Sequence, residues 1–138
     1  MMVSKYSANG NDFVIFHSDV KKDRTSLAKE ICHRQNGIGA DGLIVIVPND
    51  EYNFEWQFYN SDGSDAEMCG NGSRAAAHYA FKNNLAPKDM KFLTGAGVIG
   101  ASVEGNMDLS ALNPHKFIDK NIEFNGKSLG LLNTRSRQ

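Results

Sequence analysis

One cysteine in this sequence stands where a reactive thiol would be useful. Cys69 is followed by Gly70, Asn71 and Gly72, and then by an alanine-rich stretch that predicts a helix over 70–83. A thiol just before the first turn of a helix lies beside unpaired backbone N–H groups and the positive end of the helix dipole, which favours the thiolate. The same N–H groups can bind a carboxylate or phosphate, because glycine lets the backbone approach a ligand closely. The stretch could therefore hold an anion beside a base or nucleophile.

The spacing alone leaves a second interpretation open, in which Cys69 is a small buried residue and the glycines only turn the chain. The other cysteine, Cys32, is expected near the C-terminal end of a helix over 25–34. There the dipole opposes a thiolate, so we expect Cys32 to be structural. His78 falls on the second helix, where a packed or surface histidine is favoured over a catalytic one.

Composition narrows the classes of function. The 138 residues suit one domain with a hydrophobic core, and 15 Lys and Arg against 16 Asp and Glu give a net charge of -1. That balance offers no electrostatic basis for binding nucleic acid or an anionic membrane. The four histidines show no metal-ligand spacing, and the sequence shows neither an apolar leader nor a membrane-spanning run. Two cysteines make no disulfide framework, so we expect a reducing cytoplasm.

The hydrophobic pattern predicts short strands around the two helices. The run at 43–47 is apolar throughout and indicates a strand buried on both faces, whereas 53–59 alternates as a half-buried strand does. Glycines at 37–42 precede a strand instead of following one, which does not favour a dinucleotide loop. Strands are expected at 3–6, 13–16, 43–47, 53–59, 91–94, 98–103 and 107–112.

Three motifs occur in one order: Gly-Asn-Asp-Phe at 10–13, Gly-Ile-Gly-Ala-Asp-Gly-Leu at 37–43, and a stretch at 60–74 that ends in Met-Cys-Gly-Asn-Gly-Ser-Arg. Together they resemble the N-terminal half of diaminopimelate epimerase, a family within the epimerases and racemases that work without pyridoxal phosphate. The resemblance implies an α+β fold, with a mixed, mostly antiparallel sheet wrapped around a central helix. This is one half of a two-domain fold that binds its small-molecule substrate between the domains.

The resemblance also implies the reaction: LL- and meso-2,6-diaminopimelate are interconverted without a cofactor, in lysine and peptidoglycan precursor synthesis. Cys69 matches the first of two catalytic cysteines, and the substrate-binding positions are matched by Asn11, Asn60, Gly70 and Asn71. The chemistry agrees, because inversion at an α-carbon needs a thiolate on one face and a thiol on the other. Asparagines are also common in turns, which is the simpler interpretation of Asn11 and Asn60.

The family's second cysteine motif does not occur after Cys69, and family members are about twice this length. We therefore expect residues 1–112 to form the N-terminal domain and 113–138 to be the truncated start of the crossover to the second one. Such a fragment should have little or no epimerase activity alone.

Two further functions stay open. A proline or hydroxyproline racemase would share the paired cysteines, whereas Cys69 argues against the phenazine type of isomerase, which uses carboxylates. The other alternative is a non-catalytic half-domain that associates with itself. A homodimer of this kind would bring two Cys69 residues face to face.

Overall fold

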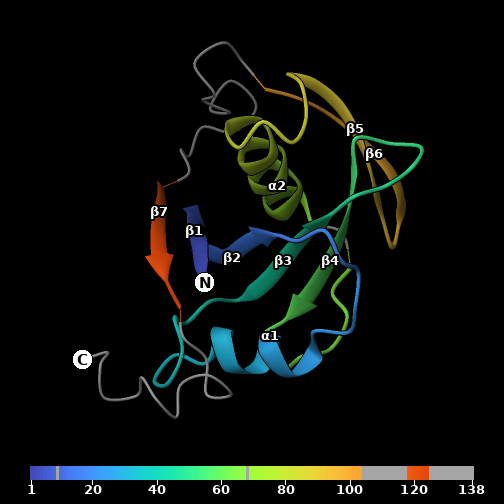
Figure 1. The fold of residues 1–138 in the computed structure, drawn as a ribbon. Coiled ribbons are helices and arrows are strands. Elements are labelled where there is room, and N and C mark those ends of the chain that lie inside the picture. Colours follow the sequence, from blue (N-terminus) through green and yellow to red (C-terminus); the bar gives the residue numbers. More distant parts are fainter. Residues whose placement is uncertain (9, 68, 104–117, 125–138) are drawn as a thin grey trace.

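The computed structural model describes residues 1–8, 10–67, 69–103 and 118–124, and its strands form a single sheet (Figure 1). The sheet order is β6-β5-β4-β3-β2-β1-β7. The β2–β3 and β4–β5 pairs are parallel and the other four pairs are antiparallel, which confirms the expected α+β fold with a mixed, mostly antiparallel sheet. The elements are β1 (Met2–Ala8), β2 (Asn11–His17), α1 (Thr25–Cys32), β3 (Gly42–Val47), β4 (Phe54–Asn60), α2 (Gly70–Lys82), β5 (Asp89–Thr94), β6 (Gly97–Ser102) and β7 (Ile118–Glu123).

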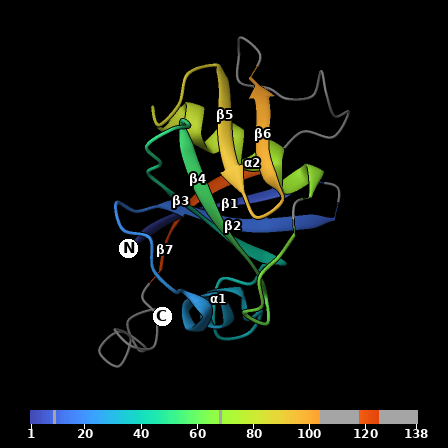
Figure 2. The same cartoon turned by 90° about the vertical axis from the view of Figure 1, so that its right-hand side faces the viewer.

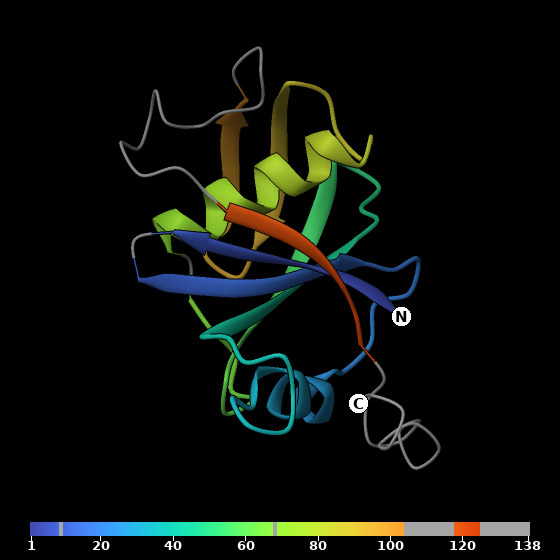
Figure 3. The same ribbon diagram turned by 90° about the vertical axis from the view of Figure 1, so that its left-hand side faces the viewer.

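The sheet curves around α2. Figure 2 shows β5 and β6 crossing in front of this helix, and Figure 3, from the opposite side, shows β1 and β7 in front of it. The helix contacts β2, β3 and β6, whereas α1 packs on the other face of the sheet against β3 and β4. The expected arrangement of a sheet wrapped around a central helix is therefore present.

Strand β3 is the partition between two hydrophobic cores. Ile44 and Ile46 belong to the core around α2, while Leu43, Val45 and Val47 belong to the core under α1. Successive side chains of a strand point to opposite faces, so a strand covered on both sides must be apolar throughout. The prediction for 43–47 is confirmed, because every residue of β3 is buried.

Small side chains let α2 approach the sheet. Ala75, Ala76 and Ala80 are fully buried among large aromatic residues of the same core, such as Trp56 and Phe92. Two polar contacts also attach this helix to the strands. The hydroxyl of Tyr6 in β1 lies 2.8 Å from Nδ1 of His78, and Nδ1 of His17 in β2 lies 2.7 Å from the hydroxyl of Tyr79. His78 is thus a packed histidine, the interpretation that its sequence position favoured.

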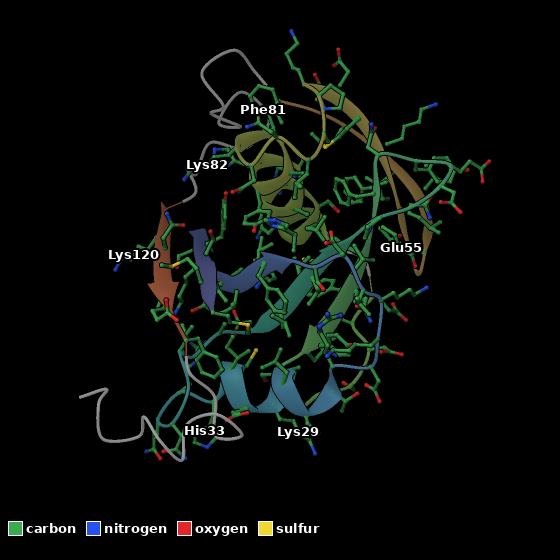
Figure 4. All side chains as sticks on the ribbon, in the orientation of Figure 1. Lys29, His33, Glu55, Phe81, Lys82 and Lys120 are labelled. Atoms are coloured by element: carbon green, nitrogen blue, oxygen red, sulfur yellow. The ribbon has the colours of Figure 1, made fainter. Side chains whose placement is uncertain are left out.

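Helix α1 begins at Thr25, where the sequence predicts, and ends at Cys32, two residues before the predicted end. Its N-cap residue is Arg24, and no side chain caps the helix. Asp23, which precedes the helix, accepts hydrogen bonds from the backbone N–H and the hydroxyl of Thr25. The Thr25 hydroxyl is therefore bound to Asp23 and not to a backbone N–H of the first turn. On the outer surface Lys29 points away from the sheet (Figure 4).

The expected strand at 107–112 and most of the segment 113–138 lie outside the described residues. Its one described strand, β7, pairs antiparallel with β1 over Met2–Ser7 and completes the sheet. The division of the chain at residue 112 stays a prediction.

Candidate active site

Two of the predicted site residues lie at one edge of the sheet. Strand β2 begins with Asn11, β3 begins with Gly42, and β4 ends with Asn60. Gly42 is paired with Phe13 on one side and with Asn60 on the other. The register therefore brings Asn11 and Asn60, which are 49 positions apart in sequence, to strand ends on either side of β3 at the same edge of the sheet.

Cys69 is the N-cap residue of α2, as the sequence predicted. Its backbone is extended (φ -137°, ψ 147°), and its sulfur accepts a hydrogen bond from the backbone N–H of Gly72 at 3.1 Å. Its carbonyl accepts two more, from the backbone and the hydroxyl of Ser73. The sulfur thus takes the place of the serine or aspartate oxygen of an ordinary cap, where negative charge is favoured by the helix.

The ring of Phe58 joins the helix start to the strand edge. A Cβ on Gly72 would lie 3.2 Å from the sulfur of Cys69 and 3.3 Å from the Phe58 ring. A Cβ on Gly42 would lie 2.9 Å from the same ring. A side chain at Gly42 would clash with this ring, and one at Gly72 would crowd both the ring and the sulfur. Cys69 therefore stands beside the edge that carries Asn60.

Asn60 also performs the turn role that the simpler interpretation gave it. Its Nδ2 donates to the hydroxyl of Ser64 at 3.0 Å, and its backbone carbonyl accepts from Gly63 at 2.9 Å. Gly63 has a φ of +88°, in the region that favours glycine. Asn60 itself is exposed, so anchoring the turn does not remove it from the surface where a substrate would bind.

On the first turn of α2, Asn71 is partly buried and Gly70 is exposed. The amide oxygen of Asn71 accepts a hydrogen bond from Nη2 of Arg74 at 2.9 Å. The structure thus groups Cys69, Gly70 and Asn71 on one turn, next to the edge that bears the two asparagines.

A charged cluster that the sequence did not reveal supports Asn11. Arg34 donates to both oxygens of Asp12, at 2.9 and 3.1 Å, and to Asp41 at 3.1 Å. Asp41 in turn accepts from the backbone N–H of Asp12 at 3.1 Å and, at 3.4 Å, from Nδ2 of Asn11. Lys5 lies 3.4 Å from Asp12. The cluster fixes the first residues of β2, from which the Asn11 side chain projects.

The cluster sets the ionisation of Asp12. Burial alone would raise the pKa of this carboxyl, but hydrogen bonds from Arg34 and from the backbone of Asp41, with the charges of Arg34 and Lys5, lower it to about 2. Asp12 is therefore a fixed anion at neutral pH. The two carboxylates belong to the motifs at 10–13 and 37–43, but Arg34 and Lys5 carried no signal in the sequence that would single them out.

The structure separates the two cysteines. Cys32 is buried in the core under α1, whereas Cys69 packs against the core around α2, on the other face of the sheet. Burial, followed by the charge of Asp12, raises the pKa of the Cys32 thiol to about 12. Cys32 is a structural residue, as expected, and cannot face the same substrate as Cys69.

Within the described part of the chain, no three His, Cys, Asp or Glu side chains gather as a metal site would require. Neither α1 nor α2, the helices that the structure describes, is long and apolar enough to cross a lipid bilayer.

A sequence model of the family described as Diaminopimelate epimerase matches residues 3–113. The chain belongs to the diaminopimelate epimerase family. A diaminopimelate epimerase of Nitratiruptor sp. is 63% identical over 134 residues, which make up 97% of this chain and 54% of that protein. One from Helicobacter pylori is 48% identical over 120 residues, or 86% of this chain and 44% of the relative. The chain spans about half the length of the curated relatives it matches.

Solved structures agree with the family on the fold. A putative phenazine biosynthesis PhzC/PhzF protein from Clostridium difficile aligns with a TM-score of 0.61 at 18% identity, over 77% of this chain and 41% of that one. A methylitaconate-delta-isomerase aligns with a TM-score of 0.59 at 16% identity, over 75% of this chain and 59% of that one. At these identities the likeness concerns the fold alone.

Proposed function

We propose that this chain supplies one half of the active site of a diaminopimelate epimerase. The reaction would interconvert LL- and meso-2,6-diaminopimelate by proton transfer at an α-carbon, without a cofactor, for lysine and peptidoglycan precursor synthesis. The observation that carries the proposal is the position of Cys69: its sulfur caps α2, accepts the Gly72 N–H at 3.1 Å, and stands beside the strand edge that bears Asn60. Membership of the family supports the choice of substrate.

In this proposal Cys69 acts as the base on one face of the substrate. Its thiolate takes the α-proton, and the electron pair left on the carbon spreads into the α-carboxylate. Backbone N–H groups at Gly70 and Asn71 are the natural stabilisers of that charge, because the first N–H groups of a helix have no partner within it. Asn11 and Asn60 offer amide donors and acceptors to hold the amino and carboxylate groups in one orientation.

Inversion also needs a proton donor on the opposite face. Cys32 lies in the other hydrophobic core and cannot supply it. We propose that the second thiol comes from another polypeptide segment, and that residues 1–138 alone have little or no epimerase activity. Both cysteines are free thiols, which supports a reducing compartment such as the cytoplasm.

The test is hydrogen exchange at the α-carbon. The chain is incubated with LL-diaminopimelate in D₂O, alone and together with the C-terminal half of the Nitratiruptor relative, and the α-proton and the meso isomer are followed by NMR. We expect the mixture to exchange and epimerise, the Cys69→Ala mixture to do neither, and a Cys32→Ala mixture to behave as the wild type.

Equal exchange with and without Cys69 would contradict the proposal, as would no exchange in either condition. Turnover by the isolated chain that rises with the square of its concentration would mean that two copies pair and that the second thiol is another Cys69. Turnover that is proportional to concentration, by a chain that sediments as a monomer, would refute the half-site.

A further inference from the structure

The side chain of Arg74 covers the turn on which the proposed substrate-binding positions lie. Long side chains on a helix point back toward its N-terminus, and Arg74 is four residues after Gly70. A Cβ on Gly70 would lie 3.4 Å from Nη2 and 3.5 Å from Nη1 of Arg74. The same Nη2 donates to the amide oxygen of Asn71 at 2.9 Å. The guanidinium group therefore adjoins two residues of the site at once.

The contact with Asn71 fixes which way its amide faces. A guanidinium group can only donate hydrogen bonds, so the atom of Asn71 that faces Arg74 must be the oxygen. The terminal torsion of asparagine is otherwise broad, and the amide could turn either end outward. With its oxygen held by Arg74, Asn71 directs its NH₂ group away from the guanidinium. An NH₂ group is the end that suits a carboxylate.

The charge of Arg74 has no carboxylate partner among the described residues. The ion pairs of those residues involve the N-terminus, Lys5, Lys21 and Arg34, and Nε of Arg74 is buried without a hydrogen-bond partner there. Arg34, by comparison, binds two carboxylates. The charge of Arg74, which no carboxylate of the described residues pairs, adds to the positive end of the α2 dipole, and both favour an anion at this turn.

We propose that Arg74 is a positioning residue for the substrate's α-carboxylate. It orients the Asn71 amide so that the NH₂ group serves the carboxylate, and it supplies positive charge to the start of α2. The inference rests on the proposed function and deepens it. It adds a residue that acts through Asn71 and does not touch the reacting carbon.

The first experiment needs no substrate. The side-chain NH₂ signals of Asn71 are recorded by ¹⁵N NMR in the wild-type chain, in Arg74→Met, which keeps the apolar stem, and in Arg74→Lys, which keeps the charge. Lys88→Met, which removes one charge from an exposed position, is the control. We expect the Asn71 signals to shift and exchange faster with solvent in Arg74→Met, to recover in part in Arg74→Lys, and to be unchanged in Lys88→Met. Unchanged signals in Arg74→Met would overturn the orienting role.

The second experiment uses the chain mixed with the C-terminal half of the Nitratiruptor relative and measures affinity for LL-diaminopimelate, with 1,5-diaminopentane, which has no carboxylates, as the comparison ligand. We expect Arg74→Met to weaken binding of diaminopimelate by about tenfold, as the loss of one charge-assisted contact does, and not to weaken binding of the doubly positive diaminopentane. In an Asn71→Ala chain, Arg74→Met should lower the affinity for diaminopimelate by a smaller factor, because part of the effect of Arg74 passes through Asn71. Equal affinity of the wild type and Arg74→Met would overturn the inference.

The two measurements separate the possible failures. A wild-type mixture that does not bind diaminopimelate, while the Asn71 amide responds to Arg74→Met, would refute the proposed function and the carboxylate role but leave the orientation of Asn71 established. A chain that binds diaminopimelate with the same affinity in every variant would refute this inference and leave the proposed function standing. Arg74→Lys decides the question if Arg74→Met does not fold.

Discussion

The two cysteines of this chain occupy opposite ends of two helices, and their surroundings differ accordingly. Cys32 is the last residue of α1 and is only 2% exposed, and burial raises its pKa to about 12. Cys69 precedes the first residue of α2, is partly buried, and accepts an N–H from the turn it caps. The same side chain is thus a core residue at one helix end and a candidate base at the other. The difference comes from the helix end and from burial, not from the residue type.

Exchanging each cysteine for alanine should separate the two roles most strongly. Cys69→Ala is expected to lower α-proton exchange in the mixture with the relative's C-terminal half by at least about 100-fold, the usual contribution of a positioned base. Cys32→Ala should leave exchange within a factor of about two and lower the free energy of unfolding by about 1 kcal/mol, because it removes one buried atom. Loss of α-proton exchange in a Cys32→Ala chain that remains folded would contradict the assignment of Cys32 to the core and of Cys69 as the base.

The glycines beside Cys69 offer a finer test within one turn. Gly72→Ala would place a methyl group 3.2 Å from the Cys69 sulfur and 3.3 Å from Phe58, so the sulfur must move. We expect exchange to fall by about tenfold and stability by about 1 kcal/mol. Gly70→Ala meets only the Arg74 guanidinium at 3.4 Å, an ordinary contact, and should not destabilise the fold. Urea denaturation measures the stability of each variant, and the exchange assay measures its activity. Equal losses of stability in Gly72→Ala and Gly70→Ala would show that Gly72 is not packed against Cys69 and Phe58.

Alkaline titration should reveal the buried thiol. The pKa of Cys32 is raised from 9.0 to about 12, so above pH 9 the unfolded chain releases a proton that the folded chain keeps, and stability falls up to pH 12. Burial likewise raises the pKa of Tyr79 from 10.0 to about 12, with a loss that begins near pH 10. In Cys32→Ala the decline of the free energy of unfolding between pH 9 and pH 10 should be smaller than in the wild type. An unchanged profile of urea midpoints against pH would contradict the burial of this thiol.

The smallest effect is expected at the charged cluster that supports Asn11. Asp12 has a pKa of about 2 against an ordinary 3.8, so its contribution is present above pH 4 and is lost as the pH falls toward 2. Arg34 is 57% exposed, so Arg34→Met should cost only about 1 kcal/mol and make the acid limb shallower. Thermal denaturation at several pH values, with Lys88→Met as the charge-matched control, measures this. A change in the control equal to that in Arg34→Met would assign the effect to net charge.

The features that depend on residues close together in sequence could be predicted from the sequence. The continuous apolar run 43–47 became a strand buried on both faces, and a cysteine followed by two glycines became the cap of α2. The family resemblance supplied the curved sheet and is confirmed by the match over 3–113. The proposed roles of Asn11, Asn60, Gly70 and Asn71 stay predictions.

Contacts that depend on strand register could not be predicted. Arg34 meets Asp12 and Asp41 only because the chain crosses through α1 to place β3 parallel to β2. The pairing of β7 with β1 joins residues more than 100 positions apart. The Arg74–Asn71 contact spans three positions on a helix and was within reach of sequence reasoning, because such residues share a helix face.

The most direct test of the account compares both thiols in one molecule. The native chain, mixed with the C-terminal half of the Nitratiruptor relative, is treated with iodoacetamide at about pH 8, and modification of each cysteine of the chain is followed by peptide mass spectrometry, with and without LL-diaminopimelate. We predict that Cys69 is alkylated while Cys32 is not until urea unfolds the chain, and that diaminopimelate slows the reaction of Cys69. Alkylation of Cys32 as fast as that of Cys69 in the folded chain, or a rate at Cys69 that diaminopimelate does not change, would contradict the assignment of Cys69 to the active site.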